Sequence, residues 1–152
     1  MTWLVILRKY FSWFATTNLA WETAHLPLYT IWTEGSAAWI AFSVVHCTGG
    51  DLLIGGASLL GALLLFGNSK WPAERYWAVA VSALVIGLAY TVYSEWHNTV
   101  VTGDWAYSGL MPIIPWTGIG LSPVAQWFII PLSAFGYLRW RGDHIQRPNE
   151  QT

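Results

Sequence analysis

Long apolar segments constrain the fold of this chain more than any other feature of the sequence. Four of them occupy approximately residues 11–32, 37–66, 77–99 and 123–140. A helix crosses the apolar part of a bilayer with about 20 residues, so each segment is long enough to span it. Only 10% of the residues are charged, whereas an ordinary soluble domain carries about 25%. We therefore expect an all-α, polytopic membrane protein whose residues 1–152 form one domain, a four-transmembrane-helix bundle.

The basic residues all fall on one side of the predicted membrane. They are Arg8, Lys9, Lys70, Arg75, Arg139, Arg141 and Arg147. Because Lys and Arg flanking membrane spans stay in the cytoplasm, this distribution predicts that both termini are cytoplasmic. We expect a multi-pass protein of the bacterial inner (plasma) membrane, with the lipid bilayer as its surroundings. The formal net charge of −1 argues against nucleic acid as a partner.

The connection between the third and fourth segments, residues 103–122, is long and hydrophobic. Connections of this length are usually functional or disordered, and the aromatic and aliphatic residues here make disorder the poorer explanation. The predicted topology places this loop outside the cell. We expect it to fold over the outer mouth of the bundle or to dip into it.

Ionisable residues inside the predicted spans are the candidates for chemistry. They are Glu22, His25, His46, Asp51, Glu95 and His97. An isolated charge at mid-bilayer costs several kcal/mol, so such residues need a reason to be there. Counted from the outer ends of the spans, the first three lie roughly 16, 12 and 15 Å deep, and Glu95 roughly 6 to 9 Å. We expect Glu22, His25, His46 and Glu95 to form one site in the outer half of the bundle. Asp51 lies deeper in the membrane, where it could support the site residues from behind or form part of a proton path.

Helical spacing decides which of these side chains can cooperate. Glu22 and His25 are three residues apart and therefore share a helix face. Glu-x-x-His pairs supply two inward ligands in dimetal helix bundles, although those sites use two such motifs and this chain has one. Glu95 and His97 are two residues apart, so at most one of them joins the site, and we favour Glu95. The alternative to a functional site is a structural one, in which these side chains only hydrogen-bond one another and thereby fix the register of the helices.

Three functions are compatible with this cluster. The preferred one is a transition-metal or haem site with imidazole ligands from His25 and His46 and a carboxylate from Glu22 or Glu95. The second is a cofactor-free membrane enzyme in which Glu22 and Glu95 perform acid–base catalysis on a lipid-like or small hydrophobic ligand. The third is a non-catalytic accessory subunit that binds other subunits of a membrane complex. The sequence leaves open whether the protein is an enzyme.

Overall fold

The chain folds into helices, described here for residues 3–146, with side chains as far as residue 140, in a computed structural model. The long helices are α1 (Trp3–His25), α3 (Ala37–Phe66), α4 (Tyr76–Trp96) and α5 (Leu121–Gln146). The short ones are the 3₁₀-helix η1 (Leu26–Leu28), α2 (Ile31–Glu34) and the π-helix η2 (His97–Val101). The described residues form no strand, which confirms the predicted all-α class. Two basic residues used to predict the orientation, Arg141 and Arg147, lie outside the described side chains.

Three of the described helices are long and apolar enough to cross a membrane. They cover Ala37–Phe66, Tyr76–Val101 and Leu121–Trp140, which correspond to the second, third and fourth predicted segments. The first predicted segment, 11–32, folds differently. Helix α1 begins earlier, at Trp3, and ends at His25, because Pro27 lacks an amide hydrogen and disfavours helical backbone at the preceding residue. Helix α1 is not among the three apolar helices, so the four-span bundle stays a prediction.

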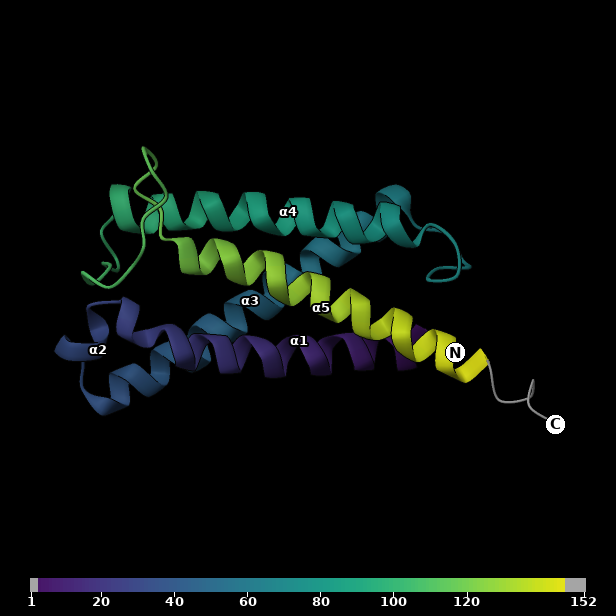
Figure 1. Cartoon of the computed structure of the whole chain (residues 1–152), viewed down its shortest axis with the longest axis horizontal. Helices are drawn as coiled ribbons and strands as arrows, with labels where there is room; N and C mark the ends of the chain where they lie inside the picture. Colours follow the sequence, from purple (N-terminus) through teal and green to yellow (C-terminus); the bar gives the residue numbers. More distant parts are fainter. Residues whose placement is uncertain (1–2, 147–152) are drawn as a thin grey trace.

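The long helices pack so that α3 and α5 each contact both α1 and α4. In Figure 1, α5 runs diagonally from α4 towards α1, and α3 crosses behind it in the other direction. One end of this assembly holds the beginning of α1, the connection from α3 to α4 and the end of α5. The opposite end holds α2 and the connection from η2 to α5 (Figure 1).

The apolar core lies between the helices and includes Tyr10, Phe14, Val79 and Phe135. Glycine is required where α4 meets α5, because a Cβ atom on Gly87 would lie 2.2 Å from Cζ3 of the Trp127 ring. Small residues of this kind let membrane helices approach closely and gain dispersion contacts. The core therefore fixes the relative positions of α1, α4 and α5.

The connection from η2 to α5 is tied to the segment that follows α1. The backbone amide of Thr30 donates to the carbonyl of Ala106 (3.0 Å), and the amide of Ser108 donates to the carbonyl of Leu28 (2.9 Å). The Ser108 hydroxyl also donates to the carbonyl of Pro27 (2.8 Å). Because Pro27 interrupts the helix, the carbonyls around it are available for these bonds. The connection is thereby held next to the end of α1.

Candidate functional site

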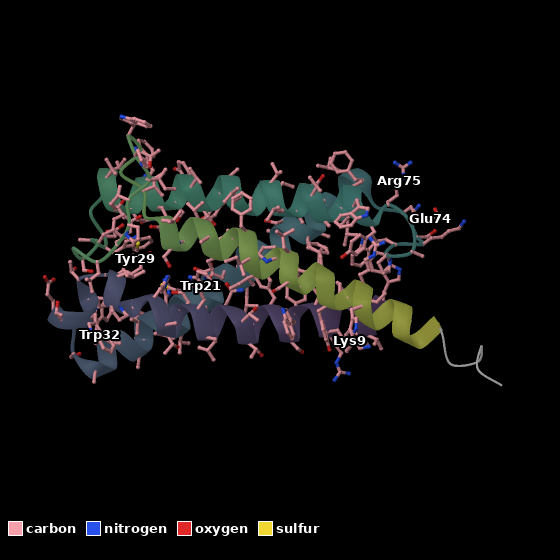
Figure 2. All side chains as sticks on the ribbon, in the orientation of Figure 1. Lys9, Trp21, Tyr29, Trp32, Glu74 and Arg75 are labelled. Carbon is pink, nitrogen blue, oxygen red and sulfur yellow. The ribbon has the colours of Figure 1, made fainter. Side chains whose placement is uncertain are left out.

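A cavity of about 750 Å³ lies at the end of the assembly that holds α2. Its walls come from the end of α1, the first half of α3, the end of α4, the beginning of α5 and residues 104–106. Figure 2 shows Tyr29, one of the lining residues, at the opposite end of the molecule from Lys9 and Arg75. A volume of this size is typical of small-molecule sites, which span about 300 to 1,000 Å³. The helices therefore enclose enough space here for a ligand.

A buried Glu–His pair from α1 forms part of the cavity wall. The Nε2 atom of His25 lies 3.1 Å from Oε2 of Glu22, as the spacing of three residues predicts. The Nδ1 atom of His25 lies 3.1 Å from the hydroxyl of Ser122 on α5. That hydroxyl accepts a hydrogen bond from Nε1 of Trp21 (3.2 Å), which leaves its own hydrogen for His25. Both ring nitrogens of His25 are therefore engaged, one by Glu22 and the other by Ser122.

A glutamine on α5 joins three acceptors, of which Asn18 and Glu22 are buried and Asp51 is partly buried. The Nε2 atom of Gln126 is 2.9 Å from Oδ1 of Asn18, 2.9 Å from Oε1 of Glu22 and 2.9 Å from Oδ2 of Asp51. Asn18 donates its own amide hydrogen to the carbonyl of Phe14 (2.8 Å), so its oxygen is the acceptor towards Gln126. An amide nitrogen carries two hydrogens and faces three oxygens here. Glu22 and Asp51 are therefore brought together around one donor.

Glu95 reaches the same cavity from α4. It is buried, and the hydroxyl of Tyr107 donates to its Oε2 atom. Burial and the neighbouring Glu95 carboxylate raise the pKa of the Tyr107 hydroxyl above its usual range, so this hydroxyl keeps its proton at neutral pH. The long connection thus supplies a fixed hydrogen-bond donor to a carboxyl group inside a helical segment.

His46 lies at the exposed rim of the cavity. Its ring stacks on Phe42, one turn earlier on α3, with centroids 5.4 Å apart. All four residues expected to form the site line this cavity, but among them only Glu22 and His25 are joined by a hydrogen bond. His97 stacks on Tyr93 instead, with ring centroids 5.7 Å apart.

No group of three or more His, Cys, Asp or Glu side chains within the described part of the chain is arranged to hold a metal ion. The metal or haem ligand expected from the sequence therefore stays a prediction. The residues that sequence reasoning missed are neutral: Asn18, Gln126, Ser122 and Tyr107. A signal for two of them existed, because Asn18 is one turn before Glu22 and Gln126 is a lone amide in an apolar segment.

The sequence matches no family model, and no curated protein or solved structure shows significant similarity to it. Any functional inference for this protein therefore depends on the geometry of the cavity itself.

Proposed function

We propose that this protein is a cofactor-free membrane enzyme that transfers a proton within a lipid-like substrate. The observation that carries the proposal is the buried pair of Glu22 and His25 on the wall of the cavity, with both imidazole nitrogens engaged. A carboxylate held by an oriented imidazole is a common arrangement for general acid–base catalysis.

Each side chain has a distinct part in this mechanism. Glu22 removes a proton from a carbon next to a double bond or carbonyl group, while Gln126 and His25 hold its two oxygens. Glu95, on a different helix, delivers a proton to another carbon of the same substrate. One proton is removed and one is added, so the double bond moves and no oxidant or reductant is needed. Proton return from Glu22 to Glu95 through solvent completes the cycle.

The substrate class follows from the surroundings of the cavity. Its lining combines these carboxyl groups with aromatic and aliphatic side chains, among them Trp39, Ile54 and Trp127. It lies among helices that are apolar enough to cross a membrane. A substrate with a hydrophobic body can enter it from the bilayer, whereas a fully polar metabolite would leave the apolar walls unmatched.

Deuterium incorporation tests this function. Purified protein is incubated in D₂O with vesicles of total lipid extract from the host cell, and lipids are analysed by mass spectrometry for carbon-bound deuterium. We expect incorporation with the wild type and a loss of about 100-fold or more for Glu22→Gln, since the general base is removed. Glu74→Gln is the matched control, because it removes the same charge at an exposed position outside the cavity. Equal incorporation by Glu22→Gln, or none by the wild type, contradicts the proposal.

We also infer that the chain crosses the inner membrane four times, with α1 as the additional span and both termini in the cytoplasm. The positions of Lys9 and Arg75 at the end away from the cavity support this orientation (Figure 2). Alkaline phosphatase, which is active only outside the cytoplasm, is expected to be inactive when fused after residue 152 and active when inserted after Gly109. The reverse pattern contradicts the orientation.

A further inference from the structure

A short hairpin occupies the second half of the connection from η2 to α5. The backbone amide of Ile114 donates to the carbonyl of Ile119 (2.8 Å), which joins the two arms. At the tip, the amide of Thr117 donates to the carbonyl of Ile114 (3.2 Å) and closes a turn whose central residues are Pro115 and Trp116. Backbone hydrogen bonds therefore hold the tip in a defined position relative to the rest of the connection.

Trp116, at this tip, has a backbone conformation that large side chains disfavour. Its φ of 64° lies in the left-handed region, which glycine and asparagine adopt readily and bulky residues rarely do. Its side chain is fully exposed, at 103%, which is the highest value among the large hydrophobic residues of the described chain. A strained backbone that directs an aromatic ring away from the protein indicates a contact outside the chain.

The hairpin lies against the end of a helical segment that is able to cross a membrane. A Cβ atom on Gly118 would lie 3.8 Å from Cγ2 of Val100. Val100 belongs to the last turn of the apolar segment Tyr76–Val101 and is 57% exposed. In Figure 1 the connection projects sideways beyond α4, near the end of that helix. The exposed apolar surface of the hairpin is therefore continuous with that of the membrane-spanning candidate.

We propose that this hairpin is an interfacial anchor that inserts Trp116 into the headgroup region of the leaflet around the end of α4. Trp is enriched at this depth because its ring contacts apolar chains while its N–H group donates to polar headgroups or water. Residues 109–120 contain no Asp, Glu, Lys or Arg, so insertion desolvates no charge. A partner protein is the alternative occupant, and the continuity with α4 favours the bilayer. The inference is independent of the proposed enzymatic function.

Fluorescence quenching at the tip tests the anchor. In a Cys47→Ser background, which removes the single native cysteine, the exposed Pro115 is replaced by Pro115→Cys and labelled with the fluorophore NBD. The full chain is placed in phosphatidylcholine nanodiscs with or without lipids that carry a nitroxide on the acyl chain close to the headgroup. We expect about twofold quenching by the nitroxide lipid, because interfacial side chains lie within roughly 10 Å of this depth.

Two other positions calibrate the signal. Glu74→Cys places the label in the exposed connection from α3 to α4, where we expect aqueous iodide to quench it and the nitroxide lipid to have little effect. Leu53→Cys places the label on α3, at a position that is 77% exposed and belongs to a candidate span. There we expect the nitroxide lipid to quench and iodide to have little effect.

Substitutions of Trp116 assign the anchoring to its ring. Trp116→Gly relieves the backbone strain and removes the ring, so quenching at position 115 by the nitroxide lipid should fall towards the value measured at position 74. Trp116→Tyr keeps an amphipathic ring and should retain most of the quenching. Unchanged quenching of the label at position 53 in both variants shows that the helices are still folded and inserted.

Three results overturn the inference. If iodide quenches the label at position 115 as strongly as the label at position 74, the tip lies in water. If neither quencher reaches position 115, the tip is covered by another protein surface. If quenching by the nitroxide lipid survives Trp116→Gly undiminished, the ring of Trp116 does not anchor the hairpin.

Discussion

The two ends of the helical assembly differ in what lies between the helices. On α1 the buried residues recur every three or four positions along one face: Ile6, Tyr10, Phe14, Asn18, Glu22 and His25. The first three pack against other rings and aliphatic side chains, whereas the last three make polar contacts, and Glu22 and His25 also line the cavity. The chemistry of this one face therefore changes between Phe14 and Asn18.

The neighbouring helices change character along with α1. On α4 the buried residues Val79, Ala83 and Gly87 are followed by Thr91 and Glu95. On α5 the order is reversed because the helix runs the other way, with Ser122 and Gln126 first and an apolar stretch from Trp127 to Leu138 after them. We call the end with the apolar core the packed end and the end with the cavity the hollow end. Apolar contacts at the packed end hold the helices together, so the polar groups at the hollow end can face one another across a cavity.

The largest expected effect comes from removing a ring at the boundary of the packed end. Phe14→Ala deletes a side chain that is 1% exposed and contacts Tyr10 and Trp127. We expect a loss of roughly 3 kcal/mol in the free energy of unfolding, the low end of the range for truncating a buried Phe. Unfolding by denaturing detergent measures it. Phe42→Ala, at a rim position that is 53% exposed, should cost far less; equal losses would show that the two ends are packed alike.

Adding a methyl group, instead of removing a ring, also distinguishes the two ends. Gly87→Ala places a Cβ atom against the rigid ring of Trp127, and we expect about 2 kcal/mol of destabilisation from overpacking. Gly49→Ala meets no atom within 4 Å and should be neutral or slightly stabilising, because Ala is the better helix former. Thermal unfolding in detergent compares the two. A neutral Gly87→Ala would mean that α4 and α5 do not meet as closely as described.

Apolar length and spacing were enough to predict most helices but not their connections. The predicted segment 37–66 coincides with α3 because apolar residues fill it and turn-forming residues flank it. The break after His25 was not predicted, because the apolar pattern of the segment continues past Pro27 to Trp32. Within the site, the Glu22–His25 bond follows from spacing on one helix. The contact of Glu95 with Tyr107 joins residues from a helix and an irregular loop, and no periodic pattern encodes it.

The smallest expected effect concerns this contact at the hollow end. Tyr107→Phe removes the hydroxyl that donates to the buried Glu95 carboxyl group, and we expect a loss of about 1 kcal/mol at neutral pH, the net value of one hydrogen bond. Burial and Glu95 raise the pKa of Tyr107 above its usual value of about 10 in the folded state. Its contribution is therefore complete below pH 10 and decreases as the pH rises from there towards the folded-state pKa.

Unfolding of wild type and Tyr107→Phe between pH 7 and pH 11 measures both effects. The difference in unfolding free energy should be constant up to about pH 10 and shrink above it, since the folded wild type retains a proton that the unfolded chain releases. Tyr93→Phe is the matched control, because Tyr93 is 55% exposed and its ring contacts with Trp96 and His97 survive in Phe. A difference that grows with pH would show that Tyr107 is not the donor. A difference of zero at every pH would mean that the hydrogen bond from the Tyr107 hydroxyl adds nothing to stability. Only the backbone hydrogen bonds of the connection from η2 to α5 would then stabilise this end of the assembly.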